Sequence, residues 1–410
     1  MLISFSDSPE YIRRTKKPFR PPQASLAEVR AVVPKHLFEK NTLRGMLYVV
    51  RDVTCVLVFY ELGWRIDPFA QACGQSLSPV VASIVRCALW ATYWIFQSLA
   101  FSGWWCLAHE AGHGTLSSIS WINHVVGFTL HTFLLVPYYA WRSSHHSHHK
   151  ATQSLERDEN YLPKTRSDYR LPAEHIAHPS DYHEIFEETP IYTLIRMIVM
   201  QAIGWNYYLL TNIMGNPSYP PGTNHFRPSS ALFKSHERSK IVASNVGLAV
   251  MASLLILWTS HVGFWSFVRF YLVPYILTNH WIVMLTYLHH SDPTLPHYRS
   301  KEWTFLRGAV STVDRPLLGW LGRFFLHNVS HDHVAHHLFS TIPFYNQPYV
   351  TEAIKTVLQD DYNYDSTNSF RALYRTFSQC CFIEDDGDIV FYKNKDGKAV
   401  RILESDLKRD

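Results

Sequence analysis

Residues 109–149 read HEAGHGTLSSISWINHVVGFTLHTFLLVPYYAWRSSHHSHH. This stretch holds two histidine clusters, HEAGH at 109–113 and HHSHH at 145–149, on either side of an apolar segment. A third cluster, HVAHH, follows at 333–337. With 24 histidines in 410 residues, one HxxHH pattern would arise by chance roughly 0.08 times per chain. Two such patterns and one HExxH therefore require a chemical explanation.

The composition is that of a membrane protein. Hydrophobic residues make up 47% of the chain and aromatic residues 15%, and long apolar runs alternate with polar stretches. Aromatic residues gather near the edges of these runs, as in an interfacial belt. The residues before the first apolar run are basic and lack the features of a secretory signal. By the positive-inside rule they predict a cytosolic N-terminus, which accounts for the net charge of +4 without nucleic-acid binding.

The apolar segments decide the topology, and they lie at 46–63, 80–107, 119–139, 190–213, 241–260 and 264–288. If all six crossed the bilayer, the first two histidine clusters would lie on opposite faces. We therefore predict about four crossings, made by the first pair of segments, which a short non-cytosolic loop at 64–79 joins, and by the last pair. Segment 119–139, which contains His124 and His131, is then re-entrant or interfacial. Segment 190–213, interrupted by Arg196, lies along the interface. Two further true crossings are the alternative.

The resulting fold class is an all-α integral membrane protein with re-entrant or interfacial helices and a cytosolic cap that holds the histidines. Residues 1–45 form a cytosolic N-terminal segment, 46–378 the membrane domain with its cap, and 379–410 a cytosolic C-terminal tail. Within the tail, residues 382–400 combine Asp-Gly with alternating apolar residues, which predicts a terminal hairpin. The six cysteines show no metal-binding spacing and are interpreted as packing residues, with lipidation of Cys380 and Cys381 as an alternative.

The spacing of the clusters predicts two metals. On a helix, residues four apart share a face, so His109 and His113 can bind one metal, as can the first and last histidines of each HxxHH. The penultimate histidine of an HxxHH points about 100° away and can reach a second metal. Imidazole suits several transition metals, but so many ligands exceed what one zinc needs. A dinuclear centre follows, and we favour iron because the site suits oxygen chemistry better than hydrolysis.

Two other classes of function stay open at this point. HExxH alone is typical of zinc proteases, with Glu110 as the base. That interpretation leaves six clustered histidines unexplained. A metal transporter or sensor without catalysis is the third possibility. Histidines that fit no cluster spacing are expected on the surface or in packing, namely His124, His131, His175, His178, His183, His225 and His236.

At these clusters the chain resembles the membrane fatty acid desaturases, in particular the microsomal acyl-lipid Δ12 (oleate) group. The resemblance runs from about residue 45 to 395, and five stretches carry it. They are GTLSSISWINHVVGFTLHTFLLVPYYAWRSSHHSHHKAT (114–152), LERDENYLPK (155–164), YLHHSDPTLPHY (287–298), FLRGAVSTVDRP (305–316) and HNVSHDHVAHHLFSTIPFYN (327–346). The resemblance implies a mushroom-shaped helical membrane protein of the endoplasmic reticulum, with a di-iron cap and a kinked acyl tunnel.

The resemblance also implies the ligands of two Fe2+ ions, and O2 is the co-substrate. The ligands carried over are His109, His113, His145, His148, His149, His333, His336 and His337. His146 stands at a position that is usually basic or polar in the family and is left out. His290 matches an additional ligand at the cytosolic end of the last span, although His289 beside it stands where the oleate group usually has Gln.

The implied reaction removes hydrogen from an unactivated acyl chain. An oleoyl chain would lose hydrogen at carbon 12 and then at carbon 13, giving a linoleoyl chain, with regioselectivity set by positioning in the tunnel. Ala108 and Glu110 resemble the oleate group and favour Δ12 over ω3 (Δ15) desaturation. Ala111, where plant relatives commonly have Cys, bears on packing only. Hydroxylation, conjugation and acetylenation share the same histidine clusters and remain alternatives.

The electron source is expected to be a separate protein, because the chain has no haem-binding HPGG motif. Cytochrome b5 with its NADH-dependent reductase is the implied donor, and a basic cytosolic surface suits an acidic carrier. The substrate is an acyl chain of a membrane lipid. Metal-bound histidines usually donate their free N–H to a neighbour. The candidates for that role are Glu110, Asp158, Asp292, His327, Asn328 and Asp332.

Overall fold

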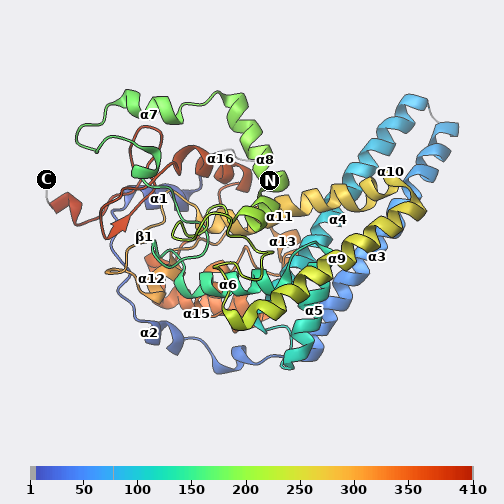
Figure 1. Ribbon diagram of the computed structural model, residues 1–410, viewed down its shortest axis with the longest axis horizontal. Helices are drawn as coiled ribbons and strands as arrows, with labels where there is room; N and C mark the ends of the chain where they lie inside the picture. Colours follow the sequence, from blue (N-terminus) through green and yellow to red (C-terminus); the bar gives the residue numbers. More distant parts are fainter. Residues whose placement is uncertain (1–5, 77, 409–410) are drawn as a thin grey trace.

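The computed structural model describes residues 6–76 and 78–408, and helices dominate it. Figure 1 shows a long helical arm that projects from a compact region of short helices and loops. Helices α3 (Thr42–Ser76), α4 (Pro79–His113), α9 (Arg238–Val262) and α10 (Phe264–Phe267) build the arm. The compact region, the cap, contains all three histidine clusters. The outermost residues of the predicted terminal segments, and Leu77 in the predicted loop 64–79, lie outside the described residues.

Helices α3 and α4 form a hairpin longer than the sequence predicts. Each has 35 residues, or about 52 Å, against about 30 Å of bilayer hydrocarbon. The Ser78 side chain caps α4 by accepting a hydrogen bond from the Val81 amide, and Pro79 occupies the first turn. Gly114 ends α4 in the left-handed conformation at φ 72°. The prediction that 64–79 is a loop was therefore wrong, because helix α3 continues to Ser76 beyond the apolar run.

The segment between the first two clusters forms a helix, a turn and a second helix. Helix α5 (Ser120–Phe133) has 14 residues, about 21 Å, too short to cross the hydrocarbon core. After a turn in which Leu135 adopts φ 55°, α6 (Tyr138–Ala151) carries the second cluster. Helix α5 packs on α4 and α9. Such a short excursion is what the predicted re-entrant or interfacial hairpin requires.

The second half of the chain supplies three more long helical segments. They are α8 (Pro190–Thr211), α9, and a run in which α10 continues through a π-helical turn, η4 (Val268–Leu272), into α11 (Val273–His290). Helices α8 and α9 expose many large apolar side chains, including Ile198 and Ile256. Within the described residues, two helical stretches are long and apolar enough to cross a membrane, Pro79–His113 and Ser235–Val262.

The cap is made of short elements. They are α1 (Pro9–Lys16), α2 (Leu26–Ala31), η1 (Lys35–Phe38), η2 (Ser167–Tyr169), α7 (Pro179–Phe186), η3 (Ser235–Glu237), α12 (Phe305–Val310), α13 (Trp320–Phe325), α14 (His333–Leu338), η5 (Phe344–Asn346), α15 (Gln347–Leu358), η6 (Gln359–Asp361), α16 (Ser369–Gln379) and η7 (Asp406–Lys408). Strands β1 (His297–Tyr298) and β2 (Ile389–Val390) form a two-residue antiparallel pair. Buried side chains from α2, α12, α14 and α15 share one hydrophobic cluster, so the N-terminal segment packs into the cap.

Both ends of the chain meet on the cap. Phe19 forms a parallel bridge with Leu403. The predicted hairpin at 382–400 forms only in part. Phe382 and Lys393 pair as antiparallel partners, but β2 within the same stretch pairs with distant β1. All six cysteines are unpaired thiols, and Cys106 is fully buried, in keeping with a packing role.

Candidate metal centre

Four helices bring the predicted ligands together. His109 and His113 lie at the C-terminal end of α4, and His290 is the last residue of α11. Helix α6 carries the second cluster and α14 the third. Contacts of α4 with α6 and of α12 with both α6 and α14 hold these helix ends in place. The structure therefore gathers, in one buried region, side chains that are more than two hundred residues apart in the chain.

Five of the histidines surround one point. Their ring nitrogens all lie within 4.8 Å of one another, and they belong to His109, His113, His145, His149 and His336. The Nε2 atom of His145 lies 3.0 Å from Nε2 of His113 and 3.1 Å from Nε2 of His149. A ring nitrogen carries either one proton or one lone pair, so it cannot satisfy two such neighbours by hydrogen bonds alone. A cation bound between these nitrogens would satisfy them all.

A second point lies next to the first. The ring nitrogens of His148, His290 and His337 lie within 4.8 Å of one another. His333 joins them, because its Nε2 atom is 3.0 Å from Nε2 of His290. The rings of His149 and His337, one from each group, stack at 4.1 Å. The two points are therefore neighbours, as in a dinuclear centre.

The division between the two groups follows helical spacing. In the second cluster, the first and last histidines (His145, His149) belong to the first group and the penultimate His148 to the second. The third cluster is reversed, with His336 in the first group and His337 in the second. Each HxxHH thus contributes to both points, because its penultimate residue faces about 100° away from the pair.

Burial favours the neutral form of several of these imidazoles, which is the form that binds metals. It lowers the pKa of His336 to about 3, and it lowers the pKa of His145, His149 and His337 well below the ordinary value. Among the described residues, several ring nitrogens have no hydrogen-bond partner. These include Nε2 of His148, His336 and His337. Buried nitrogens without partners are costly unless something else, such as a metal, binds them.

Two of the six predicted hydrogen-bond partners contact these histidines. Oε1 of Glu110 lies 3.1 Å from Nδ1 of His109, and its Oε2 accepts a 2.7 Å bond from Thr115. Oδ1 of Asp158 lies 2.6 Å from Nδ1 of His148. A carboxylate at Nδ1 directs Nε2 of the same ring towards the metal position. Because both oxygens of Glu110 are engaged, this residue is poorly placed to act as the base of a zinc protease.

The other four predicted partners lie elsewhere, and in the described structure none of their side chains hydrogen-bonds to a clustered histidine. Asp292 pairs with Arg315 at 2.7 Å and with Arg375 at 3.0 Å. His327 Nε2 bonds to Asp52 at 2.6 Å. Asn328 and Asp332 both accept bonds from Arg323. The prediction for these four was wrong, because closeness in sequence to a cluster does not fix the direction of a side chain.

His146 and His289 stand beside predicted ligands in the sequence, but neither belongs to the two histidine groups. His146 Nε2 faces the backbone oxygen of Gly112 at 3.0 Å and belongs to neither group. Nδ1 of His289 lies 2.6 Å from the oxygen of Val313, and its ring packs 4.5 Å from that of His333. Only its neighbour His290 is in the second group. Geometry thus distinguishes the adjacent pair.

Three residues contact the clustered histidines but were not predicted from the sequence to do so. The Thr152 hydroxyl lies 3.1 Å from Nδ1 of His337 and donates to the backbone oxygen of His148 at 2.9 Å. Trp141 stacks on His145 at 4.4 Å, and Tyr161 stacks on His290 at 4.7 Å. For Thr152 and Trp141, a signal was present in the sequence, because each lies four residues from a histidine of the second cluster on the same helical face.

Comparison with known proteins agrees with this geometry. The family model described as fatty acid desaturase matches residues 88–368, well over half of the chain and all three clusters. The chain belongs to the fatty acid desaturase family. A second model, a domain of unknown function (DUF3474), matches residues 11–60. Members of the desaturase family are oxidoreductases that act on fatty acyl chains.

Individual relatives cover nearly the whole desaturase chain. A Delta(12) fatty acid desaturase of Mortierella isabellina is 38% identical over 91% of this chain and 91% of its own length. An endoplasmic reticulum omega-6 fatty acid desaturase of Brassica juncea is 35% identical over 92% of this chain and 94% of its own. An oleate hydroxylase of Claviceps purpurea is 34% identical over 92% of this chain and 82% of its own.

Proposed function

We propose that this protein is an acyl-lipid Δ12 fatty acid desaturase that converts oleoyl into linoleoyl chains. The observation that carries the proposal is the division of nine buried histidines, from four helices, between two adjacent points. The desaturases that this chain resembles over nine-tenths of its length act at the Δ12 position by name. Two metals suit an oxidation of an unactivated chain, and a single hydrolytic zinc does not need this ligand set.

The donor set fits two iron ions. His109, His113, His145, His149 and His336 would hold one ion, and His148, His290, His333 and His337 the other. All nine are buried or half-buried, and imidazole suits iron among the transition metals. When bound, the two irons would supply the oxidising power by which O2, two donor electrons and two protons remove two hydrogens from the acyl chain and yield two waters.

The residues around the irons orient the ligands and keep out water. Glu110 and Asp158 accept hydrogen bonds from Nδ1 of His109 and His148, which leaves Nε2 of each ring for the metal. Buried Trp105 and Trp141 pack against His109 and His145 and exclude solvent on that side. Regioselectivity rests on holding the chain in one position, because the C–H bonds at carbons 12 and 13 are no weaker than those of the neighbouring methylenes.

We also propose that the chain crosses the endoplasmic reticulum membrane four times, with both termini on the cytosolic side. Helices α3, α4 and α9 and the α10 to α11 run would cross, and α5 and α8 would lie in or along the interface. The convergence of all three histidine clusters supports this topology. An odd number of crossings between two clusters would place those clusters on opposite faces of the membrane. The proposal is also supported by the short length of α5 and by the Brassica relative, which is named for the endoplasmic reticulum.

Electrons would come from cytochrome b5 and its NADH-dependent reductase. The chain carries a net charge of +4, and its basic N-terminal segment packs into the cap. A positive surface speeds association with an acidic carrier and makes that association sensitive to salt.

Expression in a yeast that makes oleate but no linoleate tests the proposal. Fatty acid profiles should show linoleate with the wild-type chain and none with a His145→Ala variant expressed at the same level. The Claviceps relative makes a hydroxylase the specific alternative, and hydroxy-oleate without linoleate would establish it. A new double bond at the ω3 position, with none at Δ12, would favour the other desaturase class. Metal analysis of the purified protein should find two irons per chain.

A further inference from the structure

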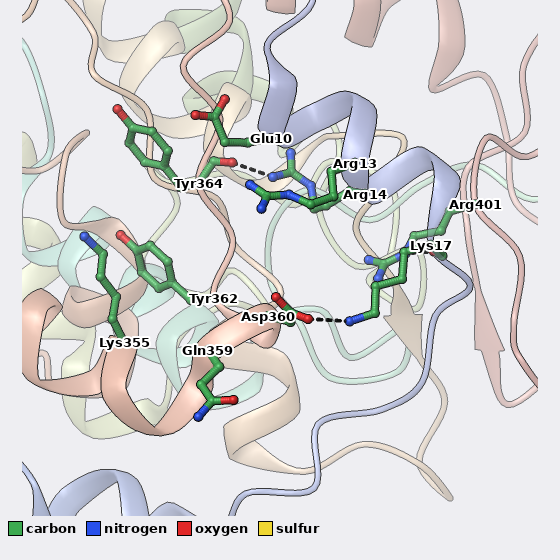
Figure 2. A pocket seen from close by; sticks show the side chains of 10 residues that line it. All are labelled: Glu10, Arg13, Arg14, Lys17, Lys355, Gln359, Asp360, Tyr362, Tyr364 and Arg401. Carbon is green, nitrogen blue, oxygen red and sulfur yellow. Dashed lines mark hydrogen bonds and ion pairs between the residues drawn. The ribbon is translucent and has the colours of Figure 1, made fainter.

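A cationic pocket lies in the cap, formed by segments from both ends of the chain. It encloses about 340 Å³ and is lined by residues of α1, of the end of α15 and the following turn, and by Arg401. Figure 2 shows these side chains facing one another across the pocket. None of them belongs to the histidine groups, and the proposed removal of hydrogen from the acyl chain uses none of them.

The pocket has an excess of positive charge. Five cationic side chains line it, and only two acidic ones, Glu10 and Asp360, oppose them. Asp360 pairs with Lys17 at 2.7 Å, and the two are drawn joined in Figure 2. Glu10 accepts a hydrogen bond from Ser366. Lys355 pairs with Glu352 at 2.7 Å. The other cations are Arg13, Arg14 and Arg401.

Arg14 is the most informative of these cations. It is only 9% exposed, and among the described residues its Nη2 atom has no hydrogen-bond partner. The nearest carboxylate oxygen, Oδ2 of Asp365, is 4.0 Å from Nη2. That oxygen already accepts bonds from Arg315 and Arg375, both at 2.5 Å. Arg14 therefore lies at the edge of a buried network in which arginines outnumber carboxylates.

The positive charge of Arg401 is likewise not balanced by a paired carboxylate among the described residues. Its guanidinium donates to two backbone oxygens, of Lys17 at 3.2 Å and Thr294 at 3.4 Å, and lies over the Phe19 ring. Within the described part of the chain it has no ion pair with a carboxylate. Burial, together with the nearby charge of Arg14, lowers the pKa of Arg401 to about 10. Arg401 is half-buried. A partly desolvated guanidinium without an anion is unfavourable, and a bound anion would relieve it.

We propose that this pocket binds a phosphate-bearing ligand. Arginine forks match phosphate oxygens in pairs. With both lysines paired to carboxylates, three arginines and only Glu10 remain, which suits a group with more than one negative charge, such as a diphosphate or a phosphate monoester. A pocket of about 340 Å³ has room for a small phosphorylated molecule or a lipid headgroup. Binding would clamp α1 to the C-terminal segment and to the end of α15.

Calorimetric titration of the full-length protein with inorganic pyrophosphate, in uncharged detergent micelles, tests the pocket. The wild type should bind pyrophosphate, with an affinity that falls as ionic strength rises. Arg13→Gln removes an exposed side chain that forms no ion pair with another described residue, so folding should persist while the affinity falls about tenfold or more. Arg401→Gln should weaken binding at least as much. Arg238→Gln, an exposed arginine at the start of α9, is the matched control and should change nothing.

A second arm distinguishes the source of the phosphate. The pyrophosphate titration is repeated in phosphatidylcholine nanodiscs with and without phosphatidic acid. Loss of pyrophosphate binding in the presence of phosphatidic acid identifies a lipid headgroup as the ligand, and unchanged binding identifies a soluble one. The proposal is overturned if the wild type binds neither probe, or if Arg238→Gln weakens binding as much as Arg13→Gln.

Discussion

Nδ1 of His148, in the last turn of α6, lies 2.6 Å from Oδ1 of Asp158, in the segment that follows the helix. The other oxygen of Asp158 accepts the Gln153 amide at 2.8 Å, and the Asn160 amide donates to Oδ1. The carboxylate is thus held in place by the backbone, and it in turn holds the ring. This contact fixes the tautomer of His148 and directs its Nε2 to the second metal position.

Asp158→Asn should lower desaturation by about 10–100-fold, the usual effect of losing such a partner. The amide keeps the shape of the side chain but cannot serve as a charged acceptor for the ring N–H. Linoleate content in yeast and iron content of the purified protein are the measurements. Asp386→Asn, at an exposed position, is the matched control and should leave both unchanged. Normal iron content and activity in Asp158→Asn would contradict the orienting role.

His290 and His289 offer a paired test of which histidine binds metal. His290→Gln should abolish linoleate formation and reduce iron towards one per chain, because the second group loses a ligand. His289→Gln should retain iron and much of the activity, since this ring faces the Val313 carbonyl. The opposite result would show that the two adjacent histidines have exchanged roles in the working enzyme.

Thr152→Val should reduce activity about tenfold and lower the free energy of unfolding by about 1–3 kcal/mol. The hydroxyl that meets Nδ1 of His337 and the backbone oxygen of His148 is lost, and both become buried groups without a partner. Thr152→Ser keeps the hydroxyl and should restore most of the activity. Equal loss in both variants would point to packing of the methyl group instead.

The buried ion network predicts acid sensitivity. Burial raises the pKa of Asp292, but Arg375 and Arg315 more than offset this and lower it to about 2. A carboxyl group whose folded pKa is below the unfolded value of about 3.9 stabilises the fold above that value and loses its contribution as pH falls towards 2. Thermal unfolding should therefore shift to lower temperature between about pH 4 and pH 2.

The variant that tests this pH dependence is Asp292→Asn. It should be less stable at neutral pH, because Arg315 and Arg375 lose a buried partner, and its stability should fall less steeply in acid. Asp386→Asn should keep the wild-type slope. An unchanged slope in Asp292→Asn would assign the acid sensitivity to other carboxyl groups.

The spacing within each cluster, together with the length of the apolar segments, was enough to predict the ligand groups and the short hairpin. His145, His148 and His149 divide between two points because helical periodicity is local, and local rules are readable in sequence. The same is true of α5, whose 14 residues cannot cross a bilayer.

Side-chain partners far apart in the chain could not be read in this way. Asp292 and Asp332 looked equivalent to Asp158, since each lies near a cluster, yet only Asp158 meets a histidine. Asp292 is engaged by arginines 23 and 83 residues away. Its partners depend on how α11, α16 and the loop before α13 pack.

The sequence by itself determined the family resemblance and the eight histidines of the three clusters that are proposed to divide between two metals, because these depend on residue type and helical spacing. Only the tertiary structure decided that His290 rather than His289 joins the second group, and that Glu110 and Asp158 alone of six candidates hold ligand rings. It also decided that Arg14 and Arg401, from opposite ends of the chain, line one pocket. Those outcomes depend on side-chain direction and on the packing of distant segments, and neither is encoded in local spacing.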